Sequence, residues 1–391
     1  MIRDLISFSD LSDLDRLFLR LRGIKGIGNV KLWNITNALF EYTNNWVEYR
    51  KEICDSIVIN CKNESIIDFN SVLELLDVFN DQRQVDDGEL LIEMKRLWGN
   101  ALRFGCRYRV GYPVDLLKMK IPPVFISTTG FIPDENIKIG VVGTRKMTEY
   151  GRDIIMSLVK VLKQYNCTIF TGFADGIDWV TFESALRYDI YVCGVIPWCL
   201  SRIPNYKFDL ISHAIRKNKC LLVSEYDGIG EVTNGNFLVR NEMLASIVDI
   251  LIVVEAPYNS GTLHTVNYAM KMSKPIGVFP ANIFSFSSEG SNKLLADSRI
   301  NVLYSLDEVE RTIDLVCGKL LMSSEIKKVI NNKSVDPITQ KIFDILENSA
   351  ITLDELVNKL NIDANSICKI LTKLEIEGIV KTDKLGHIRL L

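Results

Sequence analysis

Between residues 138 and about 305, short apolar segments alternate with segments of helical periodicity, and no other feature constrains the fold as strongly. Such alternation predicts a parallel sheet with helices on both faces. Ligands of these sheets bind beyond the carboxyl ends of the strands. Residues that follow each strand are therefore the first candidates for a site. The predicted strands are 138–142, 168–171, 191–196, 220–224, 249–255, 275–279 and 301–304.

The first strand ends at Gly143-Thr144-Arg145-Lys146, and a helical pattern follows from about residue 148 to 165. Free amides at a strand-to-helix turn, together with the helix dipole, favour an anion. Arg145 and Lys146 add positive charge at the same point. This segment alone leaves two interpretations open, which are a phosphate site and a tight turn with two solvated basic side chains.

Small, hydroxylated or glycine residues also follow other strands. They include Gly172 and Gly176 after the second strand, Ser260-Gly261-Thr262 beyond the fifth, and Gly290-Ser291-Asn292 later in the chain. Turn geometry explains any single glycine, but their recurrence predicts a shared anion-binding rim. The next glycine after Gly143 is Gly151, so the GxGxxG fingerprint is absent, and there is no P-loop motif. We therefore predict a Rossmann-like α/β core without a dinucleotide or ATPase signature.

Composition limits the remaining classes. The formal net charge of −3 over 391 residues argues against coating nucleic acid through bulk charge, so any polyanion site must be local. Nine cysteines without a CxxC pair indicate buried thiols in a reducing compartment, and three dispersed histidines predict no metal site. No cofactor is expected. Early acidic residues are unlike a signal peptide, and the apolar runs are too short for a bilayer, so we expect a soluble, cytoplasmic protein with no membrane contact.

Residues 1–110 have helical periodicity, and 111–137 are expected to be a connector. Gly23 to Gly28 separate helical patterns at 11–21 and 30–39, which is typical of a helix-hairpin-helix-like turn. Such a turn can present amides to a DNA phosphate, with Lys25 and Lys31 at its sides. It can equally be an ordinary turn that uses glycines for positive φ.

The core is expected to span 138–320, followed by a linker at 321–336 and a winged-helix domain at 337–391. Its predicted helices are 338–347, 352–360, with a Thr352–Glu355 capping box, and 364–377, capped by Asp363. A hairpin is expected around 384–386. Residues 335–391 hold seven basic and nine acidic residues, a balance of 7 − 9 = −2. This balance favours protein contact or dimerisation over duplex DNA.

Several ordered motifs together resemble the DNA-processing protein A (DprA/Smf) family. The resemblance runs through 138–305, and the helical front and winged-helix tail fit its layout more loosely. The motifs are Val141 to Arg145 with Tyr150-Gly151, Thr171 to Asp178 with Ala185-Leu186, Ser224-Glu225-Tyr226, Phe237 to Asn241, Val253 to Ala256 with Ser260-Gly261-Thr262 and Thr265, and Gly290-Ser291-Asn292.

The resemblance implies a single-stranded DNA-binding protein, not an enzyme, that forms a homodimer, protects strands and assists loading of the RecA recombinase during natural transformation. It implies that Arg145 is the main strand-binding arginine, in one pocket with Arg240-Asn241. Lys207 is a further possible basic contact. The complete set expected to bind DNA or phosphate is Gly143, Thr144, Arg145, Lys146, Gly172, Gly176, Lys207, Arg240, Asn241, Ser260, Gly261, Thr262 and Asn292.

Three positions depart from the family pattern. Asp175 and Glu242 stand where the family has arginines, and Phe182 where it has a histidine. If the acids face the groove, strand binding should be weaker, or another ligand is favoured. Phe173 and Phe182 are either base-stacking or core side chains. The alternative functions are a nucleotide hydrolase that uses Glu255 as its acid and a nucleotide-binding sensor that signals through the tail, in a setting such as defence against foreign DNA.

Overall fold

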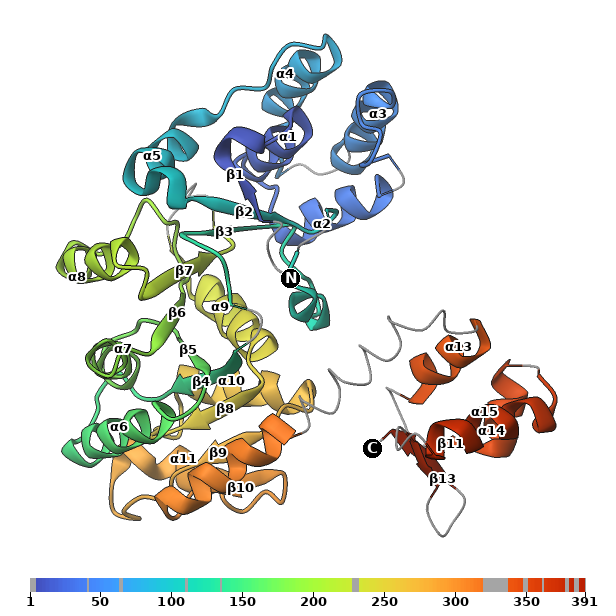
Figure 1. Cartoon of the computed structure of the whole chain (residues 1–391). Coiled ribbons are helices and arrows are strands. Elements are labelled where there is room, and N and C mark those ends of the chain that lie inside the picture. Colours follow the sequence, from blue (N-terminus) through green and yellow to red (C-terminus); the bar gives the residue numbers. More distant parts are fainter. Residues whose placement is uncertain are drawn as a thin grey trace. The chain divides into compact units, whose positions relative to one another are not determined.

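The computed structural model forms two compact units, residues 1–312 and 313–391, which are considered separately (Figure 1). The structure describes residues 5–40, 42–62, 66–109, 112–133, 136–226, 232–318, 337–346, 351–360, 362–376, 380–382 and 387–390. The linker predicted at 321–336 and the hairpin turn predicted at 384–386 lie outside these residues.

A ten-stranded sheet in the order β1-β2-β3-β7-β6-β5-β4-β8-β9-β10 organises the first unit. Its strands from β7 to β10 are all parallel, which confirms the predicted α/β core. All seven predicted strands are present, with ends that differ by up to two residues. They are β4 (Ile137–Val142), β5 (Cys167–Thr171), β6 (Tyr191–Val195), β7 (Cys220–Ser224), β8 (Ile250–Val253), β9 (Ile276–Val278) and β10 (Ile300–Val302).

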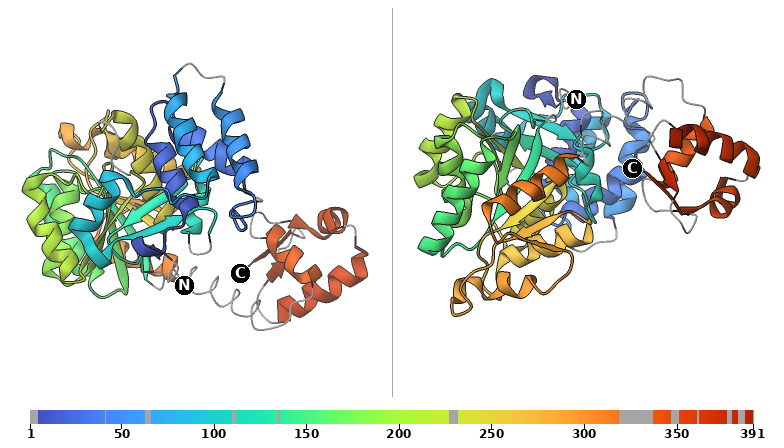
Figure 2. Two further views of the ribbon diagram at one scale, coloured as in Figure 1. Left: turned by 90° about the horizontal axis from the view of Figure 1, so that it is seen from above. Right: turned by 60° about the horizontal axis from the view of Figure 1, so that its bottom comes forward.

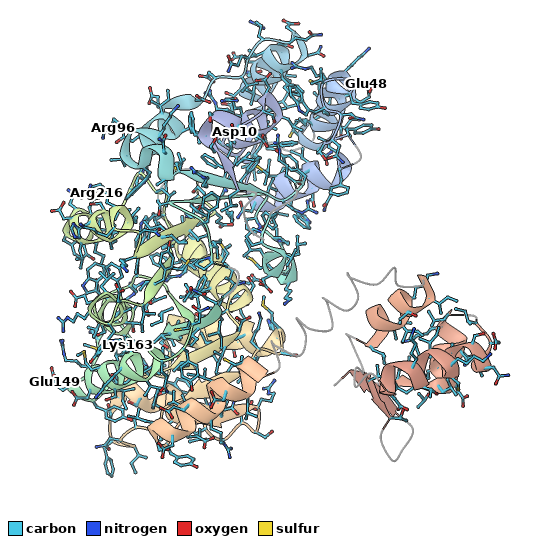
Figure 3. All side chains as sticks on the ribbon, in the orientation of Figure 1. Asp10, Glu48, Arg96, Glu149, Lys163 and Arg216 are labelled. Atoms are coloured by element: carbon cyan, nitrogen blue, oxygen red, sulfur yellow. The ribbon has the colours of Figure 1, made fainter. Side chains whose placement is uncertain are left out.

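The strand order reverses direction at β4, which lies between β5 and β8. Helices α6 (Glu149–Leu162), α7 (Ile177–Arg187) and α8 (Asn205–Arg216) cover one face, and α9 (Asn234–Ile247) and α10 (Gly261–Lys271) cover the other (Figure 1). The carboxyl ends of β4 and β8 therefore form a crevice at the topological switch point, where open α/β sheets bind ligands. Figure 3 shows charged side chains such as Glu149, Lys163 and Arg216 on the outer side of the first helical layer.

Three antiparallel strands extend the sheet beyond β7, and the sequence analysis did not predict them. They are β1 (Ile6–Ser7), β2 (Arg103–Cys106) and β3 (Phe125–Thr128), and β3 pairs with β7. Segments expected to be helical or a connector thus belong to the same sheet as the core. The strands have two to four residues, too few for a clear period-two pattern. Gly105 is needed in β2 because a Cβ there would lie 2.7 Å from the Ile126 side chain.

The N-terminal helices gather beside this edge of the sheet, in blue to cyan in Figure 2. They are α1 (Asp13–Arg22), α2 (Asn29–Ala38), α3 (Arg50–Cys61), α4 (Phe69–Asn80) and α5 (Gly88–Trp98). The predicted Gly23 to Gly28 turn does separate α1 from α2. Gly26 has φ +91°, and a Cβ there would lie 2.6 Å from the Ile66 carbonyl oxygen, so both geometry and packing require glycine.

The second unit contains helices α13 (Pro337–Leu346), α14 (Leu353–Leu360) and α15 (Ala364–Ile376). Strands β11 (Ile351–Thr352), β13 (His387–Leu390) and β12 (Val380–Thr382) form its antiparallel sheet. The predicted capping box is present, because Thr352 N–H donates to Glu355 at 3.0 Å and Glu355 N–H donates to Thr352 at 3.4 Å. Asp363 caps α15 by accepting from Ser366 N–H at 2.9 Å. The elements pack around a separate core that includes Ile342, Leu356 and Ile388.

Candidate nucleic-acid interface

A cavity of about 270 Å³ opens at the carboxyl ends of β4, β5 and β8. Nine of the thirteen predicted site residues line it: Gly143, Thr144, Arg145, Gly172, Arg240, Asn241, Ser260, Gly261 and Thr262. Ala174, Asp178, Phe237 and Pro257 are further lining residues. The structure therefore gathers most of the predicted rim around one hollow at the switch point.

Close packing between loops fixes the shape of the cavity. A Cβ on Gly143 would lie 2.5 Å from Ile177, and one on Gly176, which has φ +77°, would lie 2.4 Å from the Thr144 carbonyl oxygen. Ile177 N–H donates to the same carbonyl at 3.1 Å. Thr262 Oγ1 donates to Gly143 O at 3.0 Å and ties the start of α10 to the first loop. Gly176 thus supports the cavity wall from behind and is not part of its lining.

At the N-terminus of α6, where the sequence left a phosphate site and a tight turn open, the protein's own Glu255 carboxylate takes the bonds. Glu255 is buried, and its carboxylate accepts from Thr148 N–H at 3.0 Å and from Thr148 Oγ1 at 2.6 Å. Gly151 allows this approach, since a Cβ there would lie 2.3 Å from Glu255 Oε2. The protein's own carboxylate occupies the position where the helix dipole favours negative charge. Glu255 caps α6, which argues against its use as a catalytic acid.

The helix N-terminus that faces the cavity is that of α10. Its N-cap residue, Ser260, makes no capping hydrogen bond, and Ser260 Oγ is buried without a partner among the described residues. Gly261 and Thr262 line the cavity, and amides in a first helical turn lack intrahelical acceptors. The start of α10 therefore offers N–H and O–H donors to an anion in the cavity.

Arg240 and Asn241 form the inner wall. Arg240 is 5% exposed and donates to the carbonyls of Gly172 and, at 3.1 Å, of Val195, and its Nε donates to Asn241 Oδ1 at 2.9 Å. Asn241 Nδ2 in turn donates to Gly261 O at 3.1 Å. Burial lowers the pKa of Arg240 to about 10. Because this value is still well above neutral pH, the guanidinium remains charged. A fixed positive charge thus lies at the base of the cavity.

Asp178 is the one carboxylate among the lining residues, and it was not predicted as a site residue. It is 5% exposed, accepts from Ala174 N–H at 3.3 Å through Oδ2, and leaves Oδ1 without a partner among the described residues. Burial raises its pKa to about 6, while Arg240 and the Ala174 amide act in the opposite direction. Its position after a glycine-rich loop, in the first turn of α7, was the available sequence signal.

At the mouth of the cavity, Arg145 is exposed and its guanidinium carbon lies 5.1 Å from the centre of the Phe237 ring. Arg240 approaches the same ring at 5.8 Å. Lys146 is exposed next to Arg145 but does not line the cavity. A partly exposed aromatic ring between two arginines can stack on a base while the guanidiniums hold phosphates. Phe237 was quoted only as part of a motif, and its role as a lining residue was missed.

Two predicted contacts lie outside the cavity lining. Lys207 is buried, donates to Phe173 O at 2.6 Å and pairs with Asp175 Oδ1 at 2.9 Å. Asn292 exchanges hydrogen bonds of 3.0 Å with the backbone N–H and carbonyl of Ala281. Both side chains hold loops in place, which differs from the direct contact expected for them.

The residues that depart from the family pattern lie in different surroundings. Asp175 is exposed beside Lys207, and this lysine lowers the pKa of the Asp175 carboxyl. Glu242 points elsewhere, because its Oε1 accepts from Lys120 N–H at 3.0 Å and the residue does not line the cavity. Phe173 and Phe182 are fully buried with ring centres 4.6 Å apart, so they are core residues and not base-stacking ones.

The residues on either side of the Gly23 to Gly28 turn bind Glu225, which follows β7. Asn29 Nδ2 donates to Glu225 Oε2 at 2.9 Å, and Arg22 donates to the Glu225 carbonyl. Glu225 is buried. A carboxylate therefore lies at the start of α2, where a DNA phosphate was one of the two expectations. The other expectation, a turn that uses glycine for positive φ, agrees with Gly26.

Among the described residues, no group of three His, Cys, Asp or Glu side chains is arranged to hold a metal. Within the same residues, no helix has the length and apolar character needed to cross a membrane.

Fold and site together define a doubly wound α/β protein whose ligand cavity lies at the switch point and whose chain continues into a winged helix. The family model of DNA recombination-mediator protein A matches residues 104–314, and that of the DprA winged helix domain matches residues 331–383. The chain belongs to the DNA recombination-mediator protein A (DprA/Smf) family.

Individual relatives agree with this assignment. The chain is 27% identical to DNA processing protein DprA of Bacillus subtilis over 187 residues, which are 47% of this chain and 62% of the relative. It is 24% identical to Protein Smf of Synechocystis over 304 residues, 70% of this chain and 76% of the relative. The X-ray structure of DprA from Streptococcus pneumoniae has a TM-score of 0.60 at 20% identity and covers 77% of this chain and 98% of that chain, which shows a shared fold.

Proposed function

We propose that this protein binds single-stranded DNA, with the sugar-phosphate chain lying across the cavity at the carboxyl edge of the sheet. The observation that carries the proposal is the convergence on one cavity of two arginines, an aromatic ring and the N-terminus of α10, whose cap residue Ser260 has no side-chain partner among the described residues. Arg240 supplies a buried positive charge, and Arg145 supplies an exposed positive charge at the mouth of the cavity. The amides of α10 supply neutral donors. Phosphate contacts of this kind position a strand without reading its sequence.

The cavity suits a single strand better than a duplex. Its donors lie inside a hollow of about 270 Å³, which admits one phosphate or nucleoside at a time. Phe237 offers a ring face, and bases are free to stack on such a ring only when they are unpaired. The net charge of −3 also argues against broad electrostatic contact with duplex DNA.

By the family resemblance, we also propose that the protein acts as a homodimer and assists loading of RecA onto the bound strand. A strand-exchange assay with RecA and a light-scattering mass measurement test these two steps. Neither step is needed for the DNA-binding proposal, which has its own assay.

A titration with labelled oligo-dT and a matched duplex, at low and moderate salt, tests strand binding. We expect the single strand to bind more tightly and its affinity to fall with salt, since phosphate contacts release counterions. Weak binding that does not respond to salt would contradict the proposal.

The second candidate function is a nucleotide sensor. Asp178 Oδ1, which has no partner among the described residues and lies beside Arg240, favours it, because this acid can accept from a base or a ribose hydroxyl. Thermal-shift measurements with nucleoside mono-, di- and triphosphates test it. A mononucleotide that stabilises the protein while oligo-dT does not would favour the sensor.

A further inference from the structure

Three large apolar side chains project from one short loop. Ile283, Phe284 and Phe286 are 80%, 90% and 76% exposed, and they lie between β9 and α11 (Glu289–Leu294). We call residues 281–288 the aromatic loop. A pair of phenylalanines this exposed has no role in the core, and exposed apolar groups that cluster mark contact surfaces.

The aromatic loop is held firmly at its base. Asn292 bonds both backbone groups of Ala281 at 3.0 Å, and Asn282 Oδ1 accepts from Phe284 N–H at 2.9 Å. Tyr150 donates to the Pro280 carbonyl at 2.5 Å. The backbone that carries the rings of Phe284 and Phe286 is therefore held in place, which limits the entropy lost when a ligand stacks on them.

The aromatic loop and α11, which follows it directly, adjoin two loops of the cavity. Ser287 Oγ donates to the Lys146 carbonyl at 3.4 Å, and Lys146 follows Arg145, which lines the cavity. From α11, Ser291 N–H donates to Ala256 O at 3.0 Å. A Cβ on Gly290 would lie 2.6 Å from the carbonyl oxygen of Pro257, another lining residue. The aromatic loop thus continues the rim of the cavity.

Basic side chains lie along this continuation. Arg145 and Lys146 are exposed, and neither forms an ion pair with a described carboxylate, although the Asp175 carboxylate lies close enough to Arg145 for their charges to interact. Lys293, from α11, lies 4.8 Å from the centre of the exposed Tyr258 ring. Alternating positive charge and aromatic faces is the arrangement by which proteins follow a single strand without sequence preference.

We infer that the aromatic loop stacks the bases of a single strand that leaves the cavity past Lys146, an inference that rests on the proposed function. It extends the strand path from the cavity to Phe284 and Phe286. A second protein copy suits this loop less well, because Ser285 lies between Phe284 and Phe286, Ser287 follows them, and an interface core needs a broader apolar patch.

The test compares Phe284→Ala/Phe286→Ala with wild type on oligo-dT of about 6 and about 20 nucleotides, a span chosen to bracket the usual site sizes. We expect the double variant to bind the longer strand at least about fivefold more weakly, because each stacked base contributes about that factor or more. Its affinity for the short strand should stay unchanged. Phe284→Trp/Phe286→Trp should retain binding of the longer strand. Phe40→Ala, at a phenylalanine that is 57% exposed in the turn after α2, is the matched control.

The outcomes separate this inference from the proposed function. If wild type binds both strands and Arg145→Ala weakens both, but the double variant binds the longer strand as wild type does, the inference is overturned and strand binding stands. If wild type binds neither strand, the proposed function is wrong, and the inference that rests on it is wrong as well. A double variant whose mass in solution falls from dimer to monomer would assign the loop to self-association and would also overturn the inference.

Discussion

Lys207, from α8, forms an ion pair of 2.9 Å with Asp175, on the loop that leads into α7, and Lys207 is buried whereas Asp175 is exposed. The pair places a carboxylate near Arg145, which contributes to the lowered pKa of Asp175. Part of the positive field at the cavity mouth is thereby cancelled. The acid stands where the resemblance implies an arginine, so the pair explains how a family member can keep the cavity and weaken its charge.

Removal of that carboxylate should strengthen strand binding. Asp175→Asn keeps an oxygen for Lys207 but removes the charge, and we expect several-fold tighter binding of oligo-dT at low salt because repulsion of phosphates is relieved. Asp175→Arg should also steepen the salt dependence by roughly 0.7 in slope. Asp189→Asn, which removes a carboxylate paired with Lys219 at 2.7 Å, is the control. Equal affinities for Asp175→Asn and wild type would show that the acid does not act on the site.

Strand binding should depend on pH through Asp178. Its pKa is raised to about 6, so the carboxylate is charged at pH 7 and neutral near pH 5. A neutral acid beside Arg240 repels phosphate less, and we expect wild-type affinity for oligo-dT to rise as pH falls from about 7 to about 5. Asp178→Asn should bind more tightly at pH 7 and lose this part of the pH dependence. Parallel pH curves for the two proteins would contradict the assignment.

The raised pKa of Asp178 also predicts that the stability of the fold changes with pH, in the same direction as strand binding. Its folded pKa of about 6 lies above the reference value of 3.8, so the folded state favours the protonated form. The free energy of unfolding should therefore fall as pH rises from about 4 to about 6, by at most roughly 3 kcal/mol. Urea unfolding of wild type and Asp178→Asn across this range measures the difference. If the difference in unfolding free energy between wild type and Asp178→Asn does not change with pH, the pKa of Asp178 lies near its reference value.

Sequence patterns found the core of this fold because its strands are buried on both faces and carry continuous apolar segments, as in β4 and β8. They missed β2 and β3, whose identity depends on pairing with distant segments such as β7. Nine of the predicted site residues line the cavity, most of them because they follow strands at one edge, whereas Arg240 and Asn241 come from α9. The Glu255 cap of α6 was not predicted, because only the folded chain brings Glu255 to Thr148, more than a hundred residues away.

The Glu255 cap on α6 should contribute to stability and not to DNA contact. Thr148→Ala removes the oxygen that accepts from Gly151 N–H at 3.2 Å and that donates to Glu255. We expect unfolding to become easier by about 1–2 kcal/mol, as for other lost N-caps. Thr148→Ser should restore most of the loss. If Thr148→Ala instead causes a large drop in oligo-dT affinity without a change in stability, the N-terminus of α6 contacts the strand.

Phe237 should act as a stacking surface. Phe237→Ala should weaken oligo-dT binding by about 1–3 kcal/mol, because the ring face for a base is lost, whereas Phe237→Trp should retain it. Phe131→Ala is the matched control, since the guanidinium of Arg103 lies 5.0 Å from the Phe131 ring in a similar pair away from the cavity. Fluorescence anisotropy with each variant supplies the comparison. Equal losses in the two alanine variants would argue against a specific role for Phe237.

The most direct test of the central claim is the salt dependence of oligo-dT binding by Arg145→Ala, with Arg103→Ala as control. If Arg145 holds a phosphate at the cavity mouth, its loss should weaken binding by about 1–3 kcal/mol and lower the slope of log K against log salt by roughly 0.7. Arg103→Ala should match wild type in both. An Arg145→Ala protein with wild-type affinity and slope would contradict the account.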